Sequence, residues 1–111
     1  MVERSPTALD LTYSALAHPI RREMIQFLED GPLRVTDVAE PFRVSLAAAS
    51  KHIRTLETAG LIARRVAGRD HLLSFRPMPL VEASEWIDTT RSFWDARLDA
   101  LDAHLREGRR R

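Results

Sequence analysis

The chain has no cysteine among its 111 residues, which excludes disulfides and thiolate metal sites. No apolar run approaches the roughly 20 residues that a membrane-spanning helix needs, and the N-terminal residues are not followed by the apolar core of a signal peptide. We therefore expect a cytoplasmic protein without a membrane partner. The sequence also lacks a nucleophile–base pair, a phosphate-binding loop and a carboxylate pair, so we predict neither enzymatic activity nor a cofactor.

Lysine is nearly absent as well: sixteen of the seventeen cationic side chains are arginine, and Lys51 is the exception. The net charge of +1 is uninformative, but residues 34–76 carry eight basic and four acidic side chains, whereas both flanking segments are net acidic. Arginine binds phosphate and guanine through two parallel hydrogen bonds, which favours a nucleic-acid surface in this segment. A GC-rich genome produces the same arginine bias, so both explanations stay open.

The length indicates a single domain spanning residues 1–111. Helical periodicity and breaker residues divide its first part into helices. They predict a first helix over 7–17, a second that begins at Pro19 and stops at Gly31-Pro32, and a short third over 35–40 with Thr36 as its N-cap.

Residues 45–60 form the segment around which the rest is organised. Ser45 is a suitable helix N-cap, and Gly60 tolerates the left-handed conformation in which helices end. At about 100° per residue, the helix over 45–59 has an apolar stripe and a slim outer face without a carboxylate. The stripe is Leu46, Ala49, Ile53 and Leu56, and the outer face is Ala47, Ala48, Lys51, Arg54, Thr55 and Thr58. With the short third helix, this segment predicts a helix-turn-helix over 35–60.

After Gly60 the apolar period changes from 3.6 to 2, which predicts two strands, 61–66 and 71–75. The connection over 67–70 contains Gly68, a suitable turn residue. The hairpin carries Arg64, Arg65 and Arg69 near its tip. A helix-turn-helix followed by a basic hairpin over 61–76 predicts a winged helix.

Residues 80–107 form one long amphipathic helix, followed by a tail over 108–111 that we expect to be disordered. Its apolar stripe is too long for one small domain to cover, so we predict a homodimer in which this helix packs against a second copy. The predicted interface residues on this helix are Trp86, Ile87, Phe93, Trp94, Leu98, Leu101 and Leu105. The predicted fold is mainly α, a winged helix-turn-helix with element order α-α-α-α-β-β-α.

Three stretches, residues 17–22, 38–62 and 93–101, resemble the ArsR-type winged-helix transcriptional regulators. The resemblance covers residues 16–105 and implies a homodimeric DNA-binding regulator, usually a repressor, whose first and last helices form the dimer interface. On the first helix it adds Leu9, Tyr13 and Leu16 to the predicted interface residues. Relatives commonly have a proline where this chain has Ala47. With alanines at positions 47–49, the start of the helix over 45–59, the expected recognition helix, has little hydrogen-bonding capacity.

The resemblance also raises the question of metal sensing. Sensing at the third helix requires cysteines, which are absent. Sensing at the last helix uses an Asp-x-His pair followed by a second pair of ligands. His104 and Glu107 match the second pair, but Arg91 and Phe93 stand at the first. We therefore assign the chain to the subgroup without metal motifs and predict no metal site.

We predict double-stranded DNA as the partner, bound as a pseudo-palindromic operator. The candidate contacts are Ser45, Leu46, Ala47, Ala48, Ser50, Lys51, His52, Arg54, Arg64, Arg65 and Arg69. Ala47 and Ala48 offer only methyl groups, so DNA shape and half-site spacing would supply much of the specificity. Three alternatives stay open: His52 as a packing residue, Trp86, Phe93 and Trp94 as the lining of a small-molecule pocket, and the whole domain as a protein-interaction module. The sequence identifies no effector.

Overall fold

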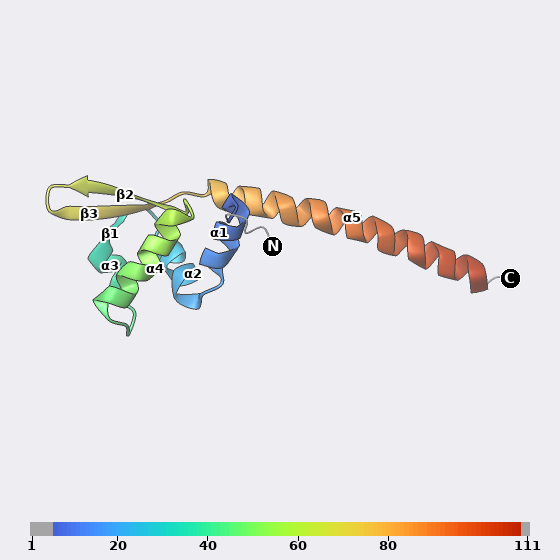
Figure 1. The fold of residues 1–111 in the computed structure, drawn as a ribbon, viewed down its shortest axis with the longest axis horizontal. Helices are drawn as coiled ribbons and strands as arrows, with labels where there is room; N and C mark the ends of the chain where they lie inside the picture. Colours follow the sequence, from blue (N-terminus) through green and yellow to red (C-terminus); the bar gives the residue numbers. More distant parts are fainter. Residues whose placement is uncertain (1–5, 110–111) are drawn as a thin grey trace, which may run out of the picture.

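The computed structural model describes residues 6–109. A small body carries a hairpin at one end and a long helix that projects from the other (Figure 1). The helices and strands are α1 (Ala8–Leu16), α2 (Pro19–Phe27), β1 (Leu33–Arg34), α3 (Val35–Ala39), α4 (Leu46–Thr58), β2 (Ile62–Ala67), β3 (Asp70–Phe75) and α5 (Met78–Arg109).

Local hydrogen bonds determine where α1 and α2 begin and end. Thr7 and Asp10 form a reciprocal capping box at the start of α1, and the bond from the Thr7 backbone N–H holds the pKa of Asp10 below its ordinary value. The Nδ1 atom of His18 accepts the Ile20 N–H at 3.2 Å and caps α2. Our prediction that this helix runs to Gly31-Pro32 was wrong. It ends at Phe27, because i→i−3 bonds over the next residues tighten the chain into a turn.

The core lies where α2, α3, α4 and the sheet meet. Its largest fully buried side chains are Met24, Val38, Ile53, Leu56, Leu61, Leu73 and Thr12. Thr12 is accommodated because its hydroxyl donates to the Ala8 carbonyl at 3.0 Å. The buried face of α4 therefore anchors that helix against the rest of the body.

The three-stranded sheet has the order β1-β3-β2, and both pairings are antiparallel. The sequence did not predict β1, which has only two residues and pairs Leu33 with Leu73. The predicted N-cap of α3 was also wrong: Arg34 occupies that position without a side-chain capping bond, because the chain enters α3 directly from β1. The remaining elements confirm a winged helix-turn-helix.

Two glycines with positive φ make the turns around the hairpin. Gly60 (φ 75°) ends α4 in a Schellman motif, in which its N–H donates to the Glu57 carbonyl and the Leu61 N–H donates to the Leu56 carbonyl. Gly68 (φ 63°) is the first residue of a two-residue loop between the paired Ala67 and Asp70, as in a type II′ turn. The hairpin loop is thus shorter than the predicted 67–70.

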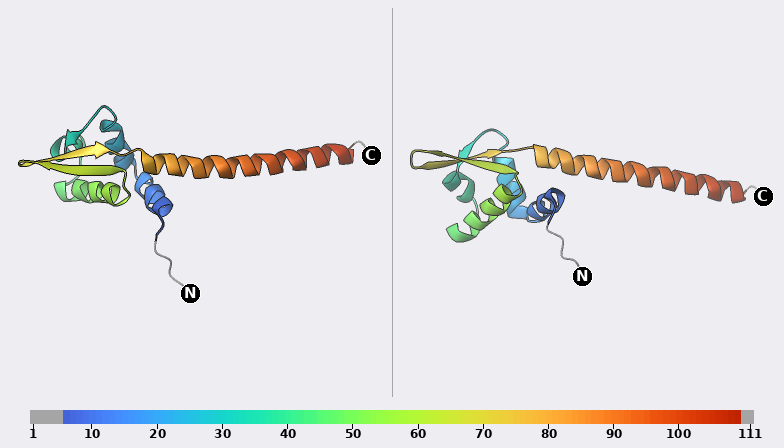
Figure 2. Two further views of the ribbon diagram at one scale, coloured as in Figure 1. Left: turned by 90° about the horizontal axis from the view of Figure 1, so that it is seen from above. Right: turned by 45° about the horizontal axis from the view of Figure 1, so that its top comes forward.

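The helix α5 begins at Met78, two residues before the predicted start, because Pro79 fits a first helical turn, where its missing N–H is not needed. It also includes Gly108 and Arg109, which we had assigned to a disordered tail; the end of that tail lies outside the described residues. Its 32 residues span about 48 Å. Figure 2 shows α1 beside the start of α5 and the remainder projecting freely. The radius of gyration is accordingly 20.4 Å, against roughly 13 Å for a compact domain of this size.

Candidate nucleic-acid interface

Four of the six residues on the predicted outer face of α4 are exposed. Ser45 caps the helix, its Oγ accepting the Ala48 N–H at 3.1 Å. Ala47, Lys51 and Arg54 are exposed, whereas Ala48 and Ser50 are half-buried. Leu46 is 67% exposed, so its assignment to the buried stripe was wrong: the stripe that the core covers begins at Ala49.

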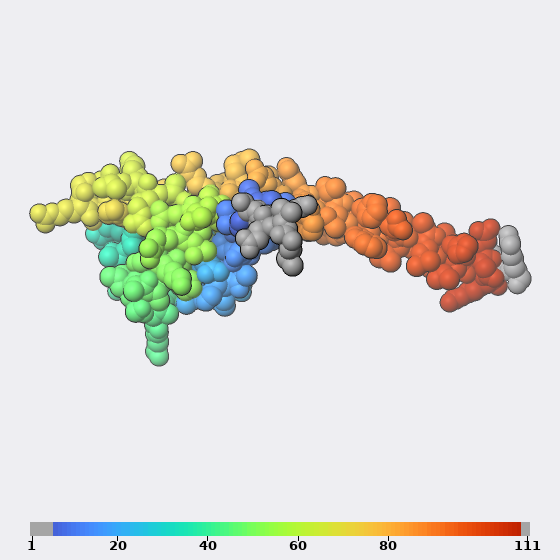
Figure 3. Space-filling model, viewed as in Figure 1, coloured from blue at the N-terminus to red at the C-terminus, as the bar shows by residue number. Residues whose placement is uncertain are grey.

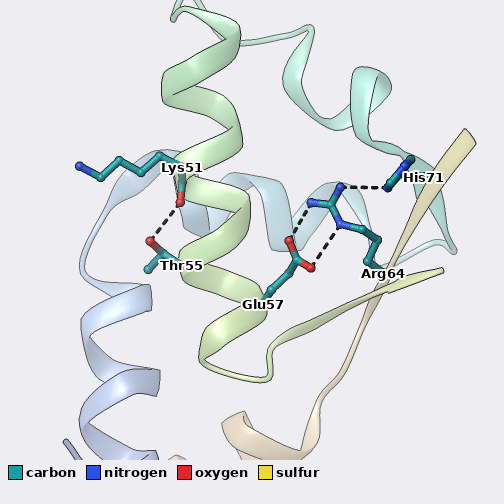
Figure 4. Close-up of polar contacts among 5 residues, drawn as sticks. All are labelled: Lys51, Thr55, Glu57, Arg64 and His71. Carbon is teal, nitrogen blue, oxygen red and sulfur yellow. Dashed lines mark hydrogen bonds and ion pairs between the residues drawn. The ribbon is translucent and has the colours of Figure 1, made fainter. Parts of the chain in front are cut away.

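The C-terminal half of this face borders α1. Lys51, Arg54, Thr55 and Thr58 line a shallow hollow of about 230 Å³ together with Leu11 and Ser14 of α1. The Thr55 hydroxyl donates to the Lys51 carbonyl at 3.1 Å, and the Lys51 side chain extends away from the helix axis (Figure 4). No carboxylate lines this hollow among the residues that the structure describes, so its charge suits an anion such as a DNA phosphate.

His52 is a packing residue at the junction of three helices. Its ring lies 4.4 Å from that of His18, centroid to centroid, and its Nδ1 accepts from Arg21 at 3.2 Å. Arg21 also donates to the Ser14 and Ala15 carbonyls at the end of α1. Burial, followed by the neighbouring His18, Arg21 and Lys51, lowers the pKa of His52. Its imidazole is therefore more readily neutral than a free histidine and is held by the body.

The arginines of the wing differ in their surroundings. Arg65 and Arg69 are exposed at and near the tip. Arg64 instead donates to both carboxylate oxygens of Glu57, at 2.7 and 3.3 Å, and to Nδ1 of His71 at 3.2 Å (Figure 4). The hydrogen bond to Glu57 raises the pKa of the Arg64 guanidinium. The candidate site thus includes an internal contact that joins the wing to the recognition helix.

Sequence reasoning missed Glu57 because it lies between the polar and apolar sides of α4. A usable signal exists: Glu57 lies three residues before Gly60 and Arg64 lies four residues after it, and a Schellman motif reverses the chain between them. An acid in the last turn of a helix and a base in the following strand are then brought together. Arg21 was also missed, because its three partners lie on two other helices, α1 and α4.

Comparison with known proteins agrees with this geometry. Residues 16–65 match the model of a helix-turn-helix domain family. An HTH-type transcriptional regulator of Mycobacterium tuberculosis, Rv2034, is 35% identical over 95 residues, which cover 86% of this chain and 83% of that protein. The crystal structure of an ArsR family transcriptional regulator superposes with a TM-score of 0.76 at 30% identity, covering 80% of this chain and 98% of the other.

This chain belongs to the ArsR family. Like these relatives, it is a winged helix-turn-helix, DNA-binding regulator of transcription and not an enzyme. The transcriptional repressor SdpR of Bacillus subtilis is 27% identical over 75 residues, which cover 68% of this chain and 83% of that protein. The resemblance drawn from residues 17–22, 38–62 and 93–101 is therefore confirmed at the level of family and fold.

In this ArsR family member, the apolar side chains on the outer part of α5 are open to solvent. Phe93, Trp94, Leu98, Leu101 and Leu105 are between 53% and 59% exposed. Figure 3 shows the helix projecting beyond the body over this part. The predicted interface residues Trp86 and Ile87, nearer the body, are also exposed.

The α1 members of the predicted interface are less accessible. Leu9 and Tyr13 are half-buried, and the Tyr13 hydroxyl donates to the Ala83 carbonyl of α5 at 2.9 Å. Leu16 packs against the chain's own core. Trp86 meets Tyr13 edge to face and lines a hollow of about 430 Å³ between α1 and α5. Phe93 and Trp94 lie further along α5 and do not line that hollow.

Residues 6–109 were also compared with the requirements of a metal site and of a membrane-spanning helix. No three His, Cys, Asp or Glu side chains in this range lie close enough together to hold a metal ion. His104 and Glu107 lie on exposed turns of α5. Within the same range, no helix combines the length and the apolarity needed to cross a bilayer.

Proposed function

We propose that this ArsR family member acts as a homodimeric repressor that binds a pseudo-palindromic operator. The recognition helix α4 enters the major groove of each half-site, and the wing contacts the flanking backbone. The observation that carries the proposal is the exposed face of α4, which presents Lys51 and Arg54 without a carboxylate. The Bacillus subtilis relative SdpR is named as a transcriptional repressor, which supports repression.

The dimer is supported by the uncovered apolar stripe of α5. Residues between Trp86 and Leu105 expose large side chains that a second copy of the helix would bury. In a two-fold dimer the two recognition helices would lie about 34–36 Å apart, which matches successive major grooves. Because two half-sites are held at a fixed distance, the operator is selected by spacing as well as by base contacts.

Direct base reading rests on few side chains. Lys51 and Arg54 can donate to guanine, and Leu46, Ala47 and Ala48 offer apolar contact to thymine methyl groups. Ser45 and the wing residues Arg65 and Arg69 suit the phosphate backbone. We therefore expect moderate base specificity, supplemented by DNA shape.

A mobility-shift titration on the promoter region of its own gene, and on sequences selected from a random pool, tests the proposal. We expect Lys51→Ala to weaken specific binding by about 1–3 kcal/mol. Arg69→Ala should weaken binding to all sequences alike and reduce the slope of log K against log salt by about one. Glu29→Gln, an exposed acid at the end of α2, serves as a surface control.

The same titration separates the alternatives. Absence of salt-sensitive binding to any sequence between about 50 and 200 mM salt, with a protein partner captured through residues 45–56, would favour an interaction module instead. Repression itself is tested with a reporter gene behind the selected operator, which the intact protein should silence and the Lys51→Ala variant should not.

A further inference from the structure

The contact between Glu57 and Arg64 joins the two elements of the proposed interface at the edge of the core. In β2 and β3 only Ile62 and Leu73 are buried, and Leu73 pairs directly with Arg64. Every residue of the hairpin from 64 to 71 is exposed. Apolar packing therefore positions the base of the wing, whereas its outer part depends on polar contacts at Arg64.

The hydrogen bonds of Arg64 are directed inward. Nε and Nη2 donate to the two Glu57 oxygens, and Nη1 donates to His71. The Arg64 and Glu57 side chains are only 30% and 27% exposed, the lowest pair of values among the ion pairs of residues 6–109. A planar guanidinium held by two oxygens and a ring nitrogen has a fixed orientation. These bonds use three of the five N–H donors of the guanidinium, and all three are directed at the protein itself.

We infer that Glu57 and Arg64 are positioning residues, which set the angle between the recognition helix and the wing, so that the carboxylate of Glu57 increases DNA affinity. The inference rests on the proposed function, because it concerns how the helix and the wing engage one DNA site together. It assigns Arg64 a different role from Arg65 and Arg69, which face the solvent.

The length of the hairpin explains why such a contact matters. Gly68 lies four residues beyond Arg64, or roughly 13 Å at the rise of an extended strand. A rotation of about 10° at the base would therefore move the tip by roughly 2 Å. That displacement is larger than the tolerance within which a binding site must be held.

The inference and simple electrostatics predict opposite changes in DNA affinity when the Glu57 carboxylate is removed. Glu57 is a negative charge beside a surface that faces phosphates, so on charge alone its removal strengthens DNA binding at all sequences. If the carboxylate holds the wing, its removal weakens binding. Glu40 provides the matched control, because it is an exposed acid in the same helix-turn-helix, just after the end of α3.

The experiment measures the affinity of the full chain for its selected operator, over a range of salt concentrations, for wild type, Glu57→Ala, Arg64→Gln, Glu40→Ala and the exchanged pair Glu57→Arg/Arg64→Glu. We expect Glu57→Ala and Arg64→Gln each to weaken binding about three- to fivefold, the effect of losing a partly exposed ion pair. The salt slope should stay unchanged in Arg64→Gln. Glu40→Ala should bind as tightly as wild type or more tightly, and the exchanged pair should recover most of the loss.

Thermal unfolding of each variant shows whether it is folded. If Glu57→Ala does not fold, the exchanged pair, which keeps both charges, provides the test instead. Glu57→Ala binding as tightly as Glu40→Ala would overturn the inference, as would a salt slope reduced by about one in Arg64→Gln, because that marks a phosphate contact. A folded exchanged pair that binds no better than the single variants would also count against it. If the wild type binds no DNA, the proposed function itself fails.

Discussion

The helices α4 and α5 are both amphipathic, but the chain covers their apolar sides to very different extents. In α4, Ala49, Ile53 and Leu56 are at most 1% exposed. In the outer half of α5, the large apolar side chains keep more than half of their surface in solvent, and only Ala83, near the body, is buried. The same periodicity therefore contributes to the core in one helix and to an open surface in the other.

The difference follows from where each helix lies. The apolar side of α4 faces α2, α3 and the sheet, and its ends are fixed by Ser45 and Gly60. Beyond its contact with α1, α5 extends past the body (Figures 1 and 2). An apolar stripe stabilises a monomer only where the same chain supplies the opposite surface. For α5 we have proposed that a second copy supplies it.

The largest expected effect is on α5. Leu98→Asp places a charge in the middle of the proposed dimer interface and should convert a dimer into a monomer, because burying an unpaired carboxylate costs several kcal/mol. Light scattering at equal protein concentration measures the change. Trp94→Asp should act in the same way.

Ala103→Asp is the matched control for that change. It adds the same charge five residues away, on the far side of the helix from Leu98 at about 100° per residue, and Ala103 is exposed. This variant should remain dimeric. A Leu98→Asp protein with the mass of an intact dimer would contradict the proposed interface.

An intermediate effect distinguishes two leucines of α4. Leu56→Ala removes a fully buried side chain and should lower the free energy of unfolding by about 2–5 kcal/mol. Leu46→Ala, at an exposed position, should change it by less than about 0.5 kcal/mol while weakening DNA binding. Chemical denaturation of both variants checks the first expectation. Equal losses of stability would show that Leu46 is part of the core after all.

The smallest expected effect is a dependence of protein stability on pH, which arises at the junction of α4 with α1 and α2. The folded state lowers the pKa of His52 below its ordinary value of 6.5 through burial and the charges of His18, Arg21 and Lys51. The unfolded chain therefore binds the proton more readily, so this group makes the protein less stable as pH falls below about 6.5. The loss is complete once pH is below the folded-state pKa.

Denaturation of wild type and His52→Gln across this range measures the contribution. The variant should lose less stability on acidification than the wild type. His104→Gln, at an exposed position on α5, should follow the wild-type curve. If His52→Gln follows it too, the junction is not the source of the pH dependence.

Much of the fold is local in origin and was predictable. Thr7, Ser45, Gly60 and Gly68 act at the expected caps and turns, because each forms its bond or adopts its φ within a few residues of sequence. The strand β1 was not predictable in this way. Two residues carry no periodicity, and Leu33–Arg34 is a strand only because β3 lies beside it.

The residues of the candidate site also fall into those that local sequence predicts and those that depend on tertiary neighbours. Lys51 and Arg54 follow from helical spacing, and the structure leaves both exposed as predicted. His52, Arg21 and Arg64 owe their surroundings to partners on other elements, which a one-dimensional pattern does not contain. Sequence spacing therefore identifies which side chains face outward, but not which of those are already engaged.

Residue spacing and residue type were sufficient to predict the winged helix-turn-helix, its basic recognition face and the length of the apolar stripe on α5. The path of the chain in three dimensions was needed to show that Glu57 and His71 hold Arg64. It also decided that α4 is covered while α5 is not. The physical reason is that burial and pairing are properties of two surfaces, and the chain's path brings the second surface to α4 but not to the outer half of α5.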